Sequence, residues 1–100
     1  DKRSSSRMIV GLLNISLLLN NSFNLKDKRR ILSSIKDQLR SKFNISISVV
    51  DDSAKYNYSQ LGVACVSSNV HFTRELLNRV LRSIEDRCDV EVINIERSIL

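Results

Sequence analysis

An eleven-residue stretch with a two-residue period, near the start of the chain, most limits what this sequence can fold into. From Ile9 to Leu19 every odd position except Gly11 is apolar, whereas the even positions include Asn14 and Ser16. Because successive side chains of a strand point to opposite faces, the pattern predicts one long strand with a fully apolar face. The polar run Asn20-Asn21-Ser22 ends this strand.

Helical spacing follows directly after the strand. Apolar residues recur at helical intervals from Leu25 to Phe43, which is typical of a helix that packs one side against a core. Asn24 is a favourable N-cap, and the carboxylate of Asp27 suits the positive end of a helix. Together these features predict a helix over residues 25–42.

The rest of the chain repeats the two kinds of pattern. Alternating and branched residues predict three further strands, and a second apolar helical repeat follows the turn-and-cap cluster Ser67-Ser68-Asn69. The predicted strands cover residues 45–49, 61–65 and 90–95, and the second helix covers 70–87. The order β-α-β-β-α-β predicts a ferredoxin-like α+β sandwich, a four-stranded antiparallel sheet with two helices on one face.

Composition places this fold in one domain over residues 8–100. Residues 1–7 lack the apolar segment of a signal peptide, and we expect them to be an extension outside the fold. Neither a disulfide framework nor a metal site is expected, because the two cysteines form no CxxC motif. Since no apolar run approaches the ~20 residues of a membrane helix, we expect a cytoplasmic protein without membrane contact.

Basic residues are concentrated in the predicted first helix. Residues 25–42 carry seven basic and two acidic residues, a net charge of +5 that equals that of the whole chain. At about 100° per residue, five of them share one side of the helix, here called the basic flank: Lys26, Arg29, Arg30, Lys36 and Arg40. Such asymmetry indicates a polyanionic partner.

Lys28 falls inside the apolar side of the same helix. An unpaired ammonium is costly to bury, so we expect this side chain to reach the end of the domain or to meet an acid. The predicted topology brings the polar loop over residues 51–58 to that end. An ion pair of Asp51 or Asp52 with Lys28 or Arg29 is therefore expected.

Several segments together resemble one known family. The stretch from Asn24 to Leu32, NLKDKRRIL, resembles the S-L-K-x-K-R-x-hydrophobic pattern of the YlxP-like family of small bacterial proteins. Other segments fit that family in the same order: Phe43-Asn44-Ile45-Ser46, Asp51-Asp52 and Leu61-Gly62-Val63-Ala64. The resemblance covers Met8 to Leu100, and it departs at Asn24, where the family has Ser, and at Tyr56-Asn57-Tyr58, where it has Trp-Gln and a base.

The resemblance implies a ferredoxin-like fold and a setting, but no reaction. The family has no assigned activity, and its genes tend to lie among genes for translation and ribosome maturation. A member would therefore be expected to work near RNA or the ribosome.

Three activities of ferredoxin-like domains lack their residues in this sequence. An acylphosphatase needs a phosphate loop with an arginine after the first strand, and Asn20-Asn21-Ser22-Phe23 has none. A copper chaperone needs a CxxC pair there. An RNA-recognition motif stacks bases on aromatic residues of its central strands, and Leu61–Val66 has none. His71, Cys65 and Cys88 form no nucleophile–base arrangement, so we expect no catalytic residue and no cofactor.

The favoured interpretation is a non-enzymatic RNA-associated protein that contacts phosphates through its first helix. The predicted contacts are Lys26, Lys28, Arg29, Arg30, Lys36, Arg40, Tyr56 and Asn57. The basic flank is equally compatible with a solvated helix face, and the loop tyrosines with a lid over the sheet edge.

A self-associating structural or regulatory module is the alternative from another class. Val10, Leu12 and Leu18 are apolar residues that the predicted sheet turns away from its helices. A monomer needs only one apolar sheet face, so the second face predicts a homodimer through the open side of the sheet.

Overall fold

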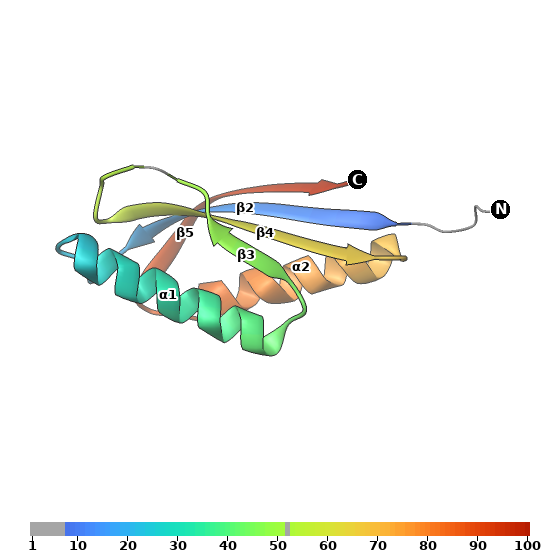
Figure 1. Cartoon of the computed structure of the whole chain (residues 1–100), viewed down its shortest axis with the longest axis horizontal. Coiled ribbons are helices and arrows are strands. Elements are labelled where there is room, and N and C mark those ends of the chain that lie inside the picture. Colours follow the sequence, from blue (N-terminus) through green and yellow to red (C-terminus); the bar gives the residue numbers. More distant parts are fainter. Residues whose placement is uncertain (1–7, 52) are drawn as a thin grey trace.

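The structure, a computed structural model, describes residues 8–51 and 53–100; the predicted extension over residues 1–7 and Asp52 lie outside the described residues. The elements in chain order are β2 (Ile9–Leu19), α1 (Leu25–Lys42), β3 (Ser46–Val49), β4 (Tyr58–Ser67), α2 (Val70–Glu85) and β5 (Val90–Ile99). The strands form one antiparallel sheet in the order β3-β4-β2-β5. Both helices lie on the same side of this sheet (Figure 1). The ferredoxin-like α+β fold is thus confirmed.

The predicted boundaries are confirmed where local signals are strong. β2 and α1 begin and end at the predicted residues, and Asn24 Oδ1 accepts a hydrogen bond from the Asp27 N–H at 2.8 Å, as an N-cap should. β4 begins at Tyr58, within the segment predicted as a loop. The prediction that Tyr58 lies in the loop is therefore wrong: it is the first residue of β4. The segment Leu61–Val66 of that strand carries no aromatic ring, as the sequence indicated.

β5 is longer than its sequence indicates. It continues to Ile99, and its pairing with β2 shifts register at Ser16 and Leu17. After this irregularity most of its side chains are exposed, so no alternation of buried and exposed residues marks the second half of the strand.

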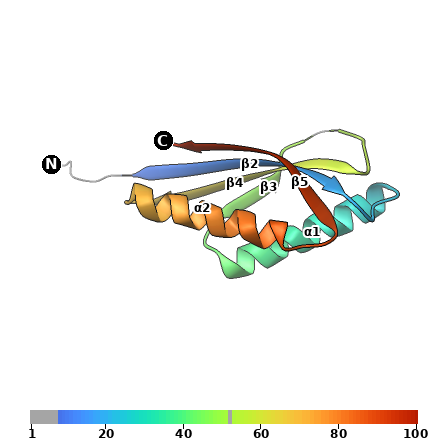
Figure 2. The same cartoon turned by 180° about the vertical axis from the view of Figure 1, so that it is seen from behind.

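The core fills the space between the sheet and the two helices. α1 packs against β3 and α2 packs against β2, β4 and β5, and Figure 2 shows both helices from behind. The apolar face predicted for β2 supplies the centre of the core, as its odd-numbered residues from Leu13 to Leu19 are buried. Ten large apolar residues of the described part of the chain are at most 2% exposed: Leu13, Ile15, Leu17, Ile35, Leu39, Leu61, Val63, Leu77, Val80 and Ile84.

Gly11 allows α2 to approach the sheet closely. A Cβ at this position would overlap Thr73 Cγ2 and lie 3.2 Å from Leu77 Cδ1. Thr73 is fully buried, and its hydroxyl donates to Asn69 O at 2.9 Å, so it cannot move aside without losing that bond. The missing side chain of Gly11 therefore sets the distance between β2 and α2.

Gly11→Ala should lower the free energy of unfolding by roughly 1–3 kcal/mol, because it overpacks a fixed contact in the core. Gly62→Ala is the matched control, since its Cβ would meet Val50, whose side chain is 51% exposed and free to turn. Urea denaturation measures both. Equal losses at the two glycines would contradict a special role for the contact of Gly11 with Thr73.

Candidate functional site at the head of the first helix

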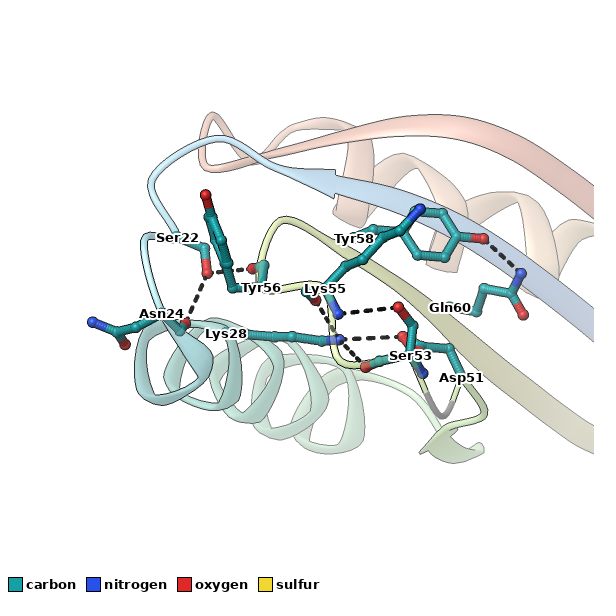
Figure 3. Close-up of polar contacts among 9 residues, drawn as sticks. All are labelled: Ser22, Asn24, Lys28, Asp51, Ser53, Lys55, Tyr56, Tyr58 and Gln60. Atoms are coloured by element: carbon teal, nitrogen blue, oxygen red, sulfur yellow. Dashed lines mark hydrogen bonds and ion pairs between the residues drawn. The ribbon is translucent and has the colours of Figure 1, made fainter.

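The ammonium group of Lys28 holds the loop between β3 and β4 against α1. Its Nζ donates to Lys55 O at 2.8 Å and Ser53 O at 3.1 Å, and lies 3.4 Å from Asp51 Oδ2 (Figure 3). The Lys28 side chain is 8% exposed. Three acceptors match the three hydrogens of the ammonium group. The buried charge is therefore fully hydrogen-bonded, and the predicted ion pair of Lys28 with Asp51 is present.

This geometry corrects one of the predicted contacts. Lys28 was expected to touch RNA, but its ammonium is buried and all its donors point into the protein. It positions the loop instead of presenting a charge to a partner. The predicted partner Asp52 lies outside the described residues.

Asp51 is held in its charged form by the groups around it. Burial raises the pKa of its carboxyl group, but the hydrogen bond from the Ser53 N–H and the positive charge of Lys28 outweigh that effect. The pKa consequently lies below its ordinary value of 3.8. The hydroxyl group of Ser59 is also buried, and it makes no hydrogen bond with any described group.

The far end of the loop is attached to the segment that precedes α1. The Ser22 hydroxyl donates to Tyr56 O, and the Leu19 N–H donates to Asn57 O at 2.9 Å. Tyr56 and Asn57 therefore lie near the start of α1, as predicted, with exposed side chains. The role of Ser22 was not predicted, because its partner is a backbone carbonyl group, which every residue carries.

The five residues of the basic flank differ in how they are used within the protein. Arg30 lies 3.3 Å from Asp27 Oδ1, and Arg40 donates to Ile47 O at 3.1 Å on the edge strand β3. Lys26, Arg29 and Lys36 take part in no ion pair within residues 8–51 and 53–100. Lys26 and Arg29 are exposed, and Lys36 is half-buried.

A groove of about 490 Å³ separates α1 from the loop. Its lining includes four apolar residues and the two basic residues Arg29 and Lys36. The apolar residues are Leu25, Leu32, Val49 and Ala54. The buried pair of Lys28 with Asp51 also borders it, so the only described carboxylate of the lining already has a positive partner.

Arg87 is a structural residue that the sequence did not distinguish from the other arginines near α2. It donates to both carboxylate oxygens of Asp89, at 3.0 and 2.8 Å, and to Gln38 Oε1 at 2.7 Å. The two hydrogen bonds from Arg87 to Asp89 hold the pKa of the Asp89 carboxyl group below its ordinary value, although burial opposes them. Arg87 thereby ties α1 to the connection between α2 and β5.

The cysteines and the histidine lie apart from this groove. Cys65 is buried in β4, where burial raises the pKa of its thiol, and Cys88 is exposed. His71 is exposed on α2, 3.9 Å from Glu75 Oε2. Among the described residues, no three His, Cys, Asp or Glu side chains gather as metal ligands. Neither described helix is long and apolar enough to cross a membrane.

Asp51→Asn should lower the free energy of unfolding by about 3 kcal/mol, because it leaves the buried Lys28 without its counter-charge. Lys28→Met combined with Asp51→Leu should recover most of that loss, since it removes both charges. Denaturant titrations of these variants, together with the single variants Lys28→Met and Asp51→Leu, measure the coupling. The exposed Asp37→Asn is the control, and additive effects at Lys28 and Asp51 would contradict the pair.

The pair also predicts a pH dependence. Because the pKa of Asp51 is lower in the folded state than in the unfolded chain, its contribution to stability is complete above pH ~4 and is lost as pH falls further. Unfolding free energy should therefore fall more steeply below pH ~4 in the wild type than in Asp51→Asn. Asp89 contributes in the same direction, so some acid sensitivity should remain.

Comparison with known proteins agrees with the resemblance seen in the sequence. The family model described as protein of unknown function (DUF503) matches residues 10–97. The uncharacterized protein YlxP of Bacillus subtilis (strain 168) is 30% identical over 83 residues, which cover 83% of this chain and 90% of that protein. The chain belongs to the DUF503 family of proteins of unknown function.

Proposed function

We propose that this protein is a non-enzymatic RNA-associated protein that binds phosphates through the basic flank of α1. The observation that carries the proposal is the groove beside that flank. There the charge of Asp51 is neutralised by Lys28, whereas Arg29 and Lys36 have no acidic partner among the described residues. Lys26 extends the same positive surface toward the start of the helix. The partner that fits such a surface is a chain of closely spaced negative charges.

The contrast between the two helices supports this proposal. α2 also carries arginines, but Glu75 and Glu85 lie among them, and its connection to β5 carries Asp86 and Asp89. α1 has only Asp27 and Asp37 against its seven basic residues. A polyanion would therefore be attracted to the face that α1 presents, and not equally to both helices.

The flank would supply affinity and orientation, and the loop would supply the shape of the site. Contacts to phosphates position a protein on RNA without reading the sequence. Tyr56 and Asn57 lie at the head of the helix with exposed side chains, where unpaired bases could be recognised by shape. The translation setting implied for the YlxP-like family suggests ribosomal RNA in the cytoplasm as the partner.

The proposal predicts phosphate contacts by four residues: Lys26, Arg29, Lys36 and Arg40. Each contact contributes roughly 0.7–0.9 to the slope of log affinity against log salt concentration, so the affinity for RNA should fall with a slope of ~3. Arg29→Gln with Lys36→Gln should lower that slope by about 1.5. Fluorescence anisotropy with labelled RNA over a range of KCl concentrations measures it. Stability should change little, because neither Arg29 nor Lys36 takes part in an ion pair among the described residues.

Arg74→Gln with Arg79→Gln on α2 is the matched control and should leave the slope nearly unchanged. Equal effects on the two helices would indicate diffuse attraction to a basic protein. An unchanged slope in the α1 variant would mean that its flank is a solvated helix face, and either result contradicts the proposal.

Self-association is a second candidate, favoured by the open face of the sheet. That face has a hollow of about 420 Å³ lined in part by Leu12, Gly62 and Ala64. Leu12 is 38% and Val66 64% exposed. Val10 and Leu18 of the predicted apolar face are half-buried instead, so Leu12 is the residue on which this candidate depends.

A dimer through this face should dissociate in Leu12→Asp, because a charge would then be buried in the interface. Sedimentation velocity at high micromolar protein concentration measures the change in mass. Val70 of α2 is an apolar residue with a similar exposed fraction. The control variant Val70→Asp should therefore leave the mass unchanged. A wild-type protein that sediments as a monomer would overturn this candidate.

A further inference from the structure

We propose that the groove between α1 and the loop that follows β3 holds one unpaired nucleotide of the bound RNA. This inference rests on the proposed function and assigns a ligand to one part of its surface. The base would lie against the apolar lining, and its phosphate would lie toward Arg29 and Lys36. The groove volume, about 490 Å³, is within the ~300–1,000 Å³ typical of small-molecule sites.

The apolar lining offers a place for a flat ring. Leu25 and Leu32 come from α1, and Val49 and Ala54 come from the facing side. Leu25 is 43% exposed although it begins a helix whose apolar side packs on the core. An exposed apolar side chain beside a groove gains from being covered by the face of a base.

The charges of the groove are complementary to a phosphate group. Arg29 and Lys36 are seven residues apart, so they lie on one side of the helix about 10 Å apart along its axis. Ser33 lies between them in the lining. Asp51 does not oppose an anion here, because its side chain is 4% exposed and pairs with Lys28.

Hydroxyl groups within the groove could distinguish a nucleotide from a simple anion. Ser33 and Ser53 both line it. Ser53 Oγ accepts from the Lys55 N–H at 3.1 Å. Its own hydrogen meets no acceptor among the described residues, so it can donate to the base or the ribose.

The wall formed by the loop is held in place before any ligand arrives. Ser53 and Lys55 are fixed through their carbonyl groups by Lys28, and Tyr56 is fixed by Ser22 (Figure 3). A site whose walls are already ordered loses less conformational freedom on binding. The groove is therefore suited to a small ligand and not only to an extended strand.

The experiment uses the full chain and four probes: adenosine 5′-monophosphate, uridine 5′-monophosphate, ribose 5-phosphate and inorganic phosphate. NMR titration of the wild type should shift the amides of Ser33, Ser53 and Ala54 with the two nucleotides. Ribose 5-phosphate and inorganic phosphate should bind at least tenfold more weakly. Equal affinity for all four probes, or shifts located elsewhere, would overturn the inference.

Variants that fill the groove without changing its charge provide the second measurement. Ser33→Trp and Ala54→Trp should weaken nucleotide and single-stranded RNA binding about tenfold, because stacking of a base is lost. Ser41→Trp, at the exposed end of the same helix, is the matched control and should bind normally. The wild-type chain contains no tryptophan, so the fluorescence of each variant, with its urea midpoint, reports whether it has folded.

Base-paired RNA separates this inference from the proposed function. The filled variants keep every charge of the basic flank, so they should bind a duplex with unchanged affinity and salt dependence. If duplex binding is present but nucleotides do not bind in the groove, the nucleotide site is wrong and the proposed function stands. If nucleotides bind in the groove but no RNA binds, the proposed function is wrong.

Discussion

The site depends on one physical constraint, the cost of burying the ammonium group of Lys28. An ammonium without partners loses far more free energy on leaving water than a hydrophobic contact returns. The acceptors that offset this cost, Asp51 Oδ2 and the carbonyl groups of Ser53 and Lys55, all come from the connection between β3 and β4. Packing α1 on the sheet therefore also requires that connection to close over the head of the helix.

This closure decides which charges remain at the surface. Lys28 and Asp51 neutralise each other inside the domain, and Arg40 is partly used at the edge of β3, where it binds the Ile47 carbonyl. β3 is a short edge strand, and the Ile47 carbonyl group on its outer edge already accepts the hydrogen bond from Arg40. It therefore has few free backbone groups with which another strand could pair. The high positive charge of α1 therefore serves two purposes, since some of its residues hold neighbouring segments and the others give the surface its positive potential.

The sequence was most informative where a structural signal is carried by side chains near one another in the chain. The alternation of β2 and the N-cap of α1 are such signals, and both elements begin and end where predicted. The second half of β5 is exposed, so its side chains carry no alternation. Within the site, the pair of Lys28 with Asp51 was foreseeable because a lysine interrupted an apolar helix side. The roles of Ser22 and of the Ser53 carbonyl were not, because backbone acceptors leave no mark on residue identity.

The arrangement of the layers bears on how the two candidate interactions would combine. Both helices lie on one side of the sheet (Figure 1), so α1 and the open face of the sheet lie on different sides of the sheet. Pairing of two copies through their open faces would leave α1 of each copy outside the interface. Each copy would then present its own positive surface, and two linked surfaces bind one long polyanion more tightly than either alone when their spacing fits. Self-association would thus strengthen RNA binding instead of competing with it.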